Sequence, residues 1–536
     1  MKRPDPPASS HRSARRFRPA VLVGMVLTMG LTVLSPASHG AALPSGDRPS
    51  GDPVRSCASL TELTFTDGTR VTSAGEAPGT PAICHVRLTV PESVNIAVSL
   101  PAHGWNGRFQ GVGGGGYAGV LTPPDDAAKA GYAAAATDTG HTGSPVSGAW
   151  AWSPTGMKQN LITDFARRSV HEMTVKGKAV TGAYYGKAPH HSYWNGCSTG
   201  GRQGLMEAQR HPEDYDGILS AAPAINWDRF IPSELWPQVV MRESGHVVSS
   251  CTFEAVNKAV VAACDGKDGV RDGIVDPRTC RFDPSKLIGK QTSCGTITAQ
   301  DAAVVKKIWE GPRRQNGSFL WYGLTPGTSF AGLAGSTPTG QAAPFPITTD
   351  WFAYWLAKNP DFDWHSVTTA DFADWFDRSR AEYHDVIGTD DPDLGAFRDG
   401  GGKLILWHGW ADQLIFPQGT IDYFQRVAAE MGGKARAERF ARLFMAPGVE
   451  HCAGGPGAAP VDPPPAFGRG DPHLASLAAL VKWVEQGDAP KTLLGRNADI
   501  TRPLCRWPAV PRYTGHGSTS DAANFRCAAA YDPQRR

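Results

Sequence analysis

Residues 191–211 have the sequence HSYWNGCSTGGRQGLMEAQRH, and this stretch decides the fold that we predict. Residues 191–195 are typical of a strand that leads into Gly196, and residues 201–211 continue as a helix. Between the two lies a G-x-S-x-G segment with Ser198 at its centre. A strand, a tight turn and a helix are the context in which such a segment exposes a serine hydroxyl. Ser198 is therefore a candidate nucleophile.

Strand and helix patterns continue on both sides of this stretch. Half-buried strands are predicted where apolar and polar residues alternate, and buried strands where apolar residues run together. The predicted strands lie within residues 85–101, 109–112, 131–137, 402–407 and 442–447, and the predicted helices cover residues 160–185 and 474–487. Strands that alternate with helices favour an α/β sheet.

Two further residues complete a candidate catalytic set with Ser198. Asp412 and His451 each follow an apolar strand pattern, and the order serine, aspartate, histidine is that of α/β-hydrolases. In this chemistry the serine attacks an ester carbonyl, the histidine takes up and returns the proton, and the aspartate orients the imidazole. Cys197 and Cys452 adjoin the serine and the histidine. A disulfide between them would hold nucleophile and base together.

A tetrahedral oxyanion also needs hydrogen-bond donors. The amide of Thr199, directly after the nucleophile, is one candidate. The glycine run from Gly113 to Gly116 supplies the second, at Gly116 or Gly115, because glycine brings its N–H close to a substrate without a Cβ. Taken singly, the glycine run could be a flexible loop, Asp412 a turn residue and His451 a solvated histidine. Their joint order along the chain favours a serine hydrolase.

Residues 226–395 interrupt the alternation of strands and helices. This segment contains eight tryptophans and four of the ten cysteines. We interpret it as a lid inserted into a core that is made of residues 43–225 and 396–536, since 536 residues are too many for one simple core. The predicted fold is thus an α/β-hydrolase core with a large inserted lid.

Residues 1–42 have the pattern of an export signal. A basic stretch includes Arg15 and Arg16, an apolar run extends from Ala20 to Leu34, and small residues follow up to Ala42. The run is shorter than the ~20 residues of a membrane span, and a retained anchor is the alternative. The two arginines permit twin-arginine export, and ordinary secretion fits equally well. We predict a secreted protein with no membrane attachment once the signal is removed.

The charge balance argues against nucleic acid as a partner. The chain has a formal net charge of +2, but residues 1–20 hold six basic residues and one acidic residue, a net of +5. Removing this +5 from +2 leaves −3 on the rest of the chain, whereas nucleic-acid-binding domains are basic.

All ten cysteines lie beyond the predicted signal. An even number in an exported protein is typical of disulfides, five in this case. Metal binding by thiolates is the alternative, and the lack of any C-x-x-C pair disfavours it. The cysteines are Cys57, Cys84, Cys197, Cys251, Cys264, Cys280, Cys294, Cys452, Cys505 and Cys527.

Residues 264–280 have the sequence CDGKDGVRDGIVDPRTC. Closely spaced carboxylates with glycines between them can wrap calcium, which takes 6–8 oxygen ligands. Three side chains and two backbone carbonyls are the candidate ligands, and a Cys264–Cys280 disulfide would close the loop. The candidates are Asp265, Asp268 and Asp272 through their carboxylates, and Val270 and Ile274 through their carbonyls. The EF-hand spacing is absent, and Asp-Gly turns on a solvated surface are the alternative.

These motifs together resemble the tannase/feruloyl esterase family. The resemblance covers about residues 57–527, and its matching segments are WNGRF at 105–109, the glycine run up to Gly119, GCSTGGR at 196–202, YDGI at 215–218, the 264–280 loop, HGWAD at 408–412 and HCAGG at 451–455. It implies the α/β-hydrolase core with its lid, the triad Ser198, Asp412 and His451, the disulfide beside it, and structural Ca2+ held by the five ligands named above.

Individual residues follow from the same resemblance. Gly116 and Thr199 fall where the family forms its oxyanion hole. Disulfides between Cys57 and Cys84 and between Cys505 and Cys527 fit family disulfides. Family members often carry a cysteine pair just after the calcium loop, whereas here Cys294 stands there alone and Cys251 lies upstream. We therefore predict a Cys251–Cys294 disulfide.

The function implied is that of a secreted serine carboxylic-ester hydrolase. Its partner would be a small aromatic ester, feruloyl, galloyl or a related phenolic ester, cleaved through an acyl-enzyme intermediate without an organic cofactor. Tryptophans of the predicted lid can supply flat walls for the acyl ring or simply form the lid core. Other small aryl esters, such as terephthalate monoesters, are the alternative substrates. Outside the enzymes, the alternative is a calcium-stabilised binding protein with a relic site.

Overall fold

The structure, a computed structural model, describes residues 51–79, 82–337, 340–461 and 476–530. The predicted signal, residues 1–42, lies outside the described residues. Contacts divide the chain into two units at residues 48 and 49, and everything described below belongs to the second unit.

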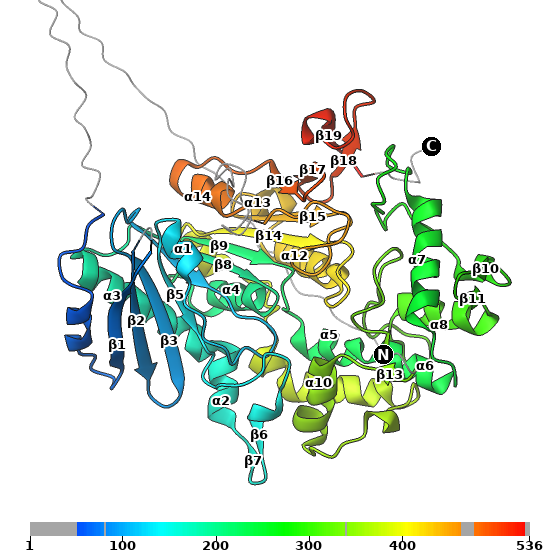
Figure 1. The fold of residues 1–536 in the computed structure, drawn as a ribbon, viewed down its shortest axis with the longest axis horizontal. Coiled ribbons are helices and arrows are strands. Elements are labelled where there is room, and N and C mark those ends of the chain that lie inside the picture. Colours follow the sequence, from blue (N-terminus) through cyan, green and yellow to red (C-terminus); the bar gives the residue numbers. More distant parts are fainter. Residues whose placement is uncertain (1–50, 80–81, 338–339, 462–475, 531–536) are drawn as a thin grey trace, which may run out of the picture. The chain divides into compact units, whose positions relative to one another are not determined.

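A nine-stranded mixed sheet organises the described residues (Figure 1). Its strand order is β1-β2-β3-β5-β4-β8-β9-β14-β15. Pairing is antiparallel from β1 to β5 and parallel from β5 to β15, so the parallel strands end at one edge of the sheet. The strands are β1 (Arg70–Ala77), β2 (Ile83–Val90), β3 (Val94–Pro101), β4 (Arg108–Val112), β5 (Ala133–Thr137), β8 (His191–Cys197), β9 (Gly217–Ala221), β14 (Lys403–Gly409) and β15 (Ala441–Ala446).

The parallel strands divide their side chains between two apolar clusters, as a period of two requires. In β14, Leu404 and Leu406 belong to one cluster, and Ile405 and Trp407 belong to the other. The first cluster includes residues of three long helices and of two short ones, and the second is covered by one long helix. The three are α3 (Ser169–Tyr185), α4 (Thr199–Arg210) and α12 (Pro417–Glu430), and the one is α14 (Ser476–Gln486). The sheet is therefore covered on both faces, which is the α/β layering that the sequence predicts.

The helix predicted over residues 160–185 forms with one local difference. The helix α2 (Gln159–Thr163) passes through a π-helical segment, Asp164–Arg168, into α3, and the chain turns at Gly186 with φ +70°. The buried side chain of Arg202 donates hydrogen bonds to two carbonyls of the π segment, at 2.8 and 3.0 Å. Because these carbonyls accept hydrogen bonds from the guanidinium of Arg202, they have partners although the wider π-helical turn changes the regular helix bonding.

Between β9 and β14, the described residues add no strand to the large sheet. All but the last of the helices there pack around a third apolar cluster, in which the rings of Trp351 and Trp355 stack at 4.8 Å. Tyr117 and Phe165 belong to the same cluster, so the segment packs against the sheet-forming part. Its helices are α5 (Trp227–Glu234), α6 (Trp236–Glu243), α7 (Ser250–Cys264), α8 (Ala299–Glu310), α9 (Pro346–Asp350), α10 (Phe372–Ile387) and α11 (Gly395–Asp399). The interpretation of residues 226–395 as a lid stays a prediction.

Short elements complete the described chain. The remaining helices are α1 (Asp125–Lys129) and α13 (Lys434–Ala437). The two-stranded pairs are β6 (Trp152–Ser153) with β7 (Gly156–Met157), β10 (Gln291–Thr292) with β11 (Gly295–Thr296), β12 (Gly335–Ser336) with β13 (Ala342–Ala343), β16 (Thr492–Arg496) with β17 (Thr501–Cys505), and β18 (Val510–Tyr513) with β19 (Phe525–Ala528). None of the helices in the described ranges is both long and apolar enough to cross a membrane.

The structure joins the ten cysteines in the five pairs that the sequence led us to expect. The pairs are Cys57–Cys84, Cys197–Cys452, Cys251–Cys294, Cys264–Cys280 and Cys505–Cys527.

Candidate active site

Ser198 occupies the tight turn between β8 and α4. Its φ of +63° is a conformation that residues other than glycine rarely adopt, and a strained backbone of this kind is concentrated at functional sites. The turn is held on both sides, because the N–H of Ser198 donates to the carbonyl of Ala221 at 3.0 Å and its carbonyl accepts from the N–H of Ala224 at 3.1 Å. A Cβ on Gly196 would lie 2.5 Å from the carbonyl of Gly200, so the turn requires glycine there.

Asp412 follows β14 and is 1% exposed. Its Oδ1 accepts the backbone N–H groups of Leu414 at 2.9 Å and Ile415 at 2.8 Å. Its Oδ2 lies 2.8 Å from His451 Nδ1 and 2.9 Å from His408 Nε2. Burial opposes ionisation, but the charge of His451 and the hydrogen bonds of both histidines outweigh it and hold the pKa of Asp412 well below its usual range. Asp412 is therefore a carboxylate at neutral pH.

His451 lies in the loop after β15, and its side chain is 14% exposed. Burial by itself lowers the pKa of the imidazole, but the charge and hydrogen bond of Asp412 raise the pKa of His451 above its ordinary value. The backbone N–H of His451 donates to Oε1 of Gln413 at 3.0 Å, which fixes the loop next to Asp412. With Nδ1 directed at the carboxylate, Nε2 is the nitrogen that remains for proton transfer.

His408 is a part of the site that sequence reasoning missed. It is fully buried, its Nδ1 lies 2.8 Å from the hydroxyl of Thr420, and its Nε2 lies 3.1 Å from the carbonyl of Ile415 besides its contact with Asp412. Both neighbours of Nε2 are acceptors, so Nε2 carries the hydrogen and Nδ1 accepts from the hydroxyl. The spacing of four residues between His408 and Asp412 was the available signal.

Ser198 and His451 line the same cavity, whose volume is about 360 Å³. The disulfide between Cys197 and Cys452, with a Cα–Cα distance of 5.9 Å, joins the residues next to them across 255 positions of sequence. Apolar side chains form most of the walls. The described residues that line the cavity are Gly115, Gly116, Pro145, Val146, Ser198, Thr199, Ala224, Trp227, Phe230, Ile231, Glu234, Phe345, Ile347, Leu414, Ile415 and His451.

The two predicted oxyanion-hole residues adjoin each other at this cavity. Thr199 is the first residue of α4, where backbone N–H groups have no partner within the helix. Its hydroxyl donates to the carbonyl of Gly116 at 2.6 Å. Gly116 has φ +53°, and a Cβ there would lie 2.1 Å from the carbonyl oxygen of Pro145. This position therefore accepts only glycine.

The chain resembles known proteins over most of its length. The family model described as "Tannase and feruloyl esterase" matches residues 81–528. A probable feruloyl esterase of Arthroderma benhamiae is 44% identical over 475 residues, which cover 83% of this chain and 86% of the relative. Feruloyl esterase B from Aspergillus oryzae superimposes with a TM-score of 0.78 at 28% identity, covering 88% of this chain and 99% of that structure. Tannin acyl hydrolase from Aspergillus niger gives a TM-score of 0.73 at 26% identity, with 86% and 90% covered.

The chain belongs to the tannase and feruloyl esterase family. The members are carboxylic ester hydrolases, and the chain is therefore an enzyme of this kind with the α/β-hydrolase fold. The alternative of a binding protein with a relic site is set aside.

The predicted calcium loop of this family member lies between α7 and Cys280. Each predicted carboxylate accepts a backbone N–H of the loop: Asp265 from residue 272 at 3.1 Å, Asp268 from residue 270 at 3.0 Å, and Asp272 from residue 274 at 3.1 Å. Burial and the charges of Asp272 and Asp265 raise the pKa of Asp268. Asp272 also accepts a hydrogen bond from Arg502 of β17. Crowded, partly buried carboxylates next to the buried Val270 and Ile274 are a donor set that fits a hard cation.

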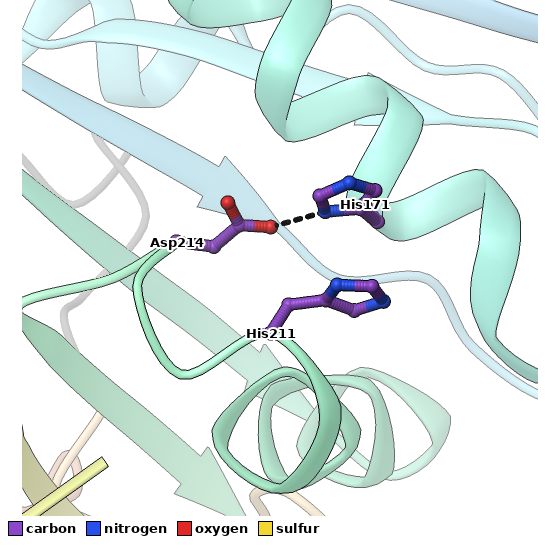
Figure 2. Close-up of side chains that lie close together, drawn as sticks. All are labelled: His171, His211 and Asp214. Atoms are coloured by element: carbon purple, nitrogen blue, oxygen red, sulfur yellow. Dashed lines mark hydrogen bonds and ion pairs between the residues drawn. The ribbon is translucent and has the colours of Figure 1, made fainter. Parts of the chain in front are cut away.

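The other histidine clusters of the described residues have different explanations. Figure 2 shows His171 of α3, His211 and Asp214, with His171 Nδ1 hydrogen bonded to Asp214 Oδ2 at 2.7 Å. The two imidazole rings stack at 3.8 Å and 12°. An imidazole binds metal along its ring plane, so two stacked rings cannot both point at one ion. We interpret this cluster as a structural contact between α3 and the end of α4.

The second cluster contains His190, His191 and Glu485. Glu485 accepts two hydrogen bonds from the guanidinium of Arg108, at 2.6 and 2.7 Å, and one from the hydroxyl of Tyr193 at 2.8 Å. These bonds lower the pKa of Glu485 against the opposing effect of burial. The guanidinium already neutralises this carboxylate, so the cluster joins β4, β8 and α14 rather than forming a metal site.

Proposed function

We propose that this enzyme is a secreted serine esterase that hydrolyses phenolic esters of the feruloyl or galloyl type. The observation that carries the proposal is that Ser198 and the Asp412-bonded His451 line one cavity with largely apolar walls. An aromatic acyl group fits such walls. The names of the relatives from Arthroderma benhamiae, Aspergillus oryzae and Aspergillus niger support the same substrate class.

The residues perform the reaction in two steps. The hydroxyl of Ser198 attacks the ester carbonyl, its proton passes to Nε2 of His451, and the C–O bond to the alcohol breaks as His451 returns that proton to the leaving oxygen. Water then attacks the acyl-enzyme, gives its proton to His451, and the proton returns to Ser198 as the acid leaves. Asp412 keeps the Nδ1 hydrogen in place and stabilises the imidazolium during both steps. The N–H groups of Thr199 and Gly116 are the proposed donors to the oxyanion.

The cavity favours phenolic esters over terephthalate monoesters. A terephthalate monoester carries a free carboxylate, which needs a cation or several donors when it is buried. The described residues that line the cavity include no lysine or arginine, and they include the carboxyl group of Glu234. A neutral phenolic ring is the better match for such a pocket.

Replacing the nucleophile tests the proposal. Ser198→Ala is expected to lower kcat for methyl ferulate by at least about 10³-fold while the melting temperature changes little. Ser318→Ala, an exposed serine elsewhere, is the matched control and keeps full activity. A fluorophosphonate probe should label the wild type and the control but not Ser198→Ala. Undiminished turnover of Ser198→Ala would contradict the serine mechanism.

We further propose structural calcium in the loop, ligated by Asp265, Asp268 and Asp272 through their carboxylates and by Val270 and Ile274 through their carbonyls. A metal that binds only the folded state stabilises it by linkage. Chelation with EGTA should therefore lower the melting temperature, and added calcium should restore it. Asp268→Asn should reduce this response, whereas Asp361→Asn, at an exposed aspartate outside the loop, should retain it. An unchanged melting temperature in EGTA would remove the calcium proposal.

Secretion is the third part of the proposal. The five disulfides support an oxidising compartment, because cytosolic thiols are kept reduced. Expression of the full chain in an exporting host should yield extracellular or periplasmic protein whose N-terminus lies near residue 43. Retention of residues 1–42 in the membrane fraction would instead indicate an anchor.

A further inference from the structure

Glu234, the last residue of α5, is a carboxyl group in the wall of the reaction cavity that the mechanism does not use. Its side chain is 1% exposed, and its Oε2 is buried without a hydrogen-bond partner in the described part of the chain. It is the only carboxyl group among the described residues that line the cavity. The surrounding walls are apolar, with Trp227, Phe230 and Ile231 on the same helix.

The physical state of this group follows from its surroundings. Burial and the negative charge of Asp412 raise the pKa of Glu234 well above its ordinary value. Burial disfavours the charged form of the side chain, and the protonated form has one O–H donor and a carbonyl acceptor. A buried polar group without a partner costs about 1–3 kcal/mol, so such groups call for an explanation.

A buried polar side chain with a purely structural role occurs one helical turn after Glu234. Gln238 in α6 is also fully buried, and its Nε2 donates to the carbonyls of Leu333 and Gly335, both at 3.0 Å. That side chain joins two segments of the predicted lid. Glu234 has no such bond and borders the space that receives the substrate.

We propose that Glu234 hydrogen bonds a ring hydroxyl of the aromatic acyl group and so selects phenolic esters. A phenol offers one donor and one acceptor, the complement of a neutral carboxylic acid, and its ring is covered by the apolar walls. A substrate that carried a carboxylate would instead place this charge next to the carboxyl group of Glu234, and no lysine or arginine among the described residues lines the cavity to neutralise it. This inference rests on the proposed function, because it assigns the acyl group to the cavity of Ser198 and His451.

The wild-type enzyme gives the first test. Its kcat/KM is compared for methyl cinnamate and for its 3-hydroxy, 4-hydroxy and matching methoxy derivatives. The better hydroxylated ester should exceed methyl cinnamate by about tenfold, the effect of one hydrogen bond of roughly 1.4 kcal/mol. The methoxy ester at the same position should lose that advantage because it has no O–H to donate. Equal rates for hydroxylated and unsubstituted esters would overturn the inference.

Variants supply the second test, and the quantity measured is the ratio of kcat/KM between the better hydroxylated ester and methyl cinnamate. Glu234→Leu should bring this ratio close to one, and Glu234→Gln should keep most of it, since a carboxamide also donates and accepts. Glu207→Gln is the matched control, because Glu207 is a fully buried glutamate that does not line the cavity. Its ratio should equal that of the wild type.

The outcomes separate this inference from the function on which it rests. An unchanged ratio in Glu234→Leu overturns the assignment of Glu234 and leaves the esterase proposal standing. A wild type that hydrolyses none of the esters overturns both. If Glu234→Leu fails to fold, as circular dichroism would show, the wild-type series and Glu234→Gln still decide: a hydroxyl preference that Glu234→Gln retains supports the inference, and its absence in the wild type contradicts it.

Discussion

Two buried carboxyl groups of the site, Asp412 after β14 and Glu234 at the end of α5, have pKa values that are shifted in opposite directions. Asp412 accepts four hydrogen bonds, and its pKa is held well below the usual range. Glu234 has an unpartnered Oε2, and its pKa is raised well above the usual range. Both side chains are 1% exposed. Burial by itself therefore does not set the pKa of a carboxyl group; the neighbouring charges and the hydrogen bonds to the charged form decide the direction of the shift.

The largest difference in activity is expected when one carboxyl oxygen of each group is replaced by an amide nitrogen. Asp412→Asn should lower kcat by about 10⁴-fold, because an amide no longer fixes the imidazole tautomer or stabilises its charge. Glu234→Gln should lower kcat by far less for any ester. Steady-state kinetics on methyl ferulate measures both, and similar losses in the two variants would contradict the different roles.

The covalent link beside the triad gives the next largest effect. Replacing Cys197 and Cys452 by serine frees the turn of Ser198 from the loop of His451, and small misplacements of reacting groups can cost about 10²-fold in rate. The closed loop is long, so the double variant should also lose about 2–4 kcal/mol of stability. The Cys505→Ser, Cys527→Ser variant is the control for a lost disulfide that does not adjoin Ser198 or His451. Full turnover without the 197–452 bond would show that the bond is dispensable for catalysis.

A smaller effect is expected at His408, which we interpret as a positioning residue that acts through Asp412. His408→Ala removes one of the four hydrogen bonds to the carboxylate and should lower kcat about tenfold. His408→Gln can still donate and should recover part of the loss. The kcat/KM profile adds a second readout. A carboxylate that has lost one donor is a stronger acceptor, so the pKa of His451 should rise and the acid limb of activity should move to higher pH. An unshifted limb would assign His408 a purely structural role.

The smallest effect concerns stability and pH. A carboxyl group whose pKa is raised on folding makes the fold less stable as pH rises from about 4.3, its unfolded value, towards the folded value. Glu234→Gln removes this loss, so its melting temperature relative to wild type should increase from pH 4 to pH 8 by roughly 1–2 °C. Asp412 has the opposite sign, because its contribution is lost as pH falls below about 3.9. Scanning calorimetry at several pH values checks both signs.

Residues with a local pattern were predictable from sequence. The turn of Ser198 follows from glycines at fixed positions, and β8 and α4 flank it as the apolar pattern indicates. Asp412 and His451 follow apolar strands, and the parallel sheet brings the ends of those strands to one edge. In these cases the chemistry is carried by residues whose position along a strand or turn also fixes their place in space.

Residues defined by burial were not predictable. Glu234 lies in the segment IPSELWPQ, where an acidic residue between two nearby prolines is typical of an exposed helix end. Only the packing of the predicted lid makes it a wall of the cavity. His408 was visible as part of a motif, but its bonds to Asp412 and Thr420 depend on the turn after β14. The stacked rings of His171 and His211 likewise depend on how α3 meets the end of α4.

The bond between Cys197 and Cys452 encloses 255 positions of sequence, among them the whole segment between β9 and β14. A protease that cuts the backbone once between β9 and β14 produces two fragments, one with the serine and the other with the aspartate and histidine. The fragments remain one molecule until a reductant separates them. Electrophoresis of nicked enzyme should therefore show one band without thiol and two bands with it.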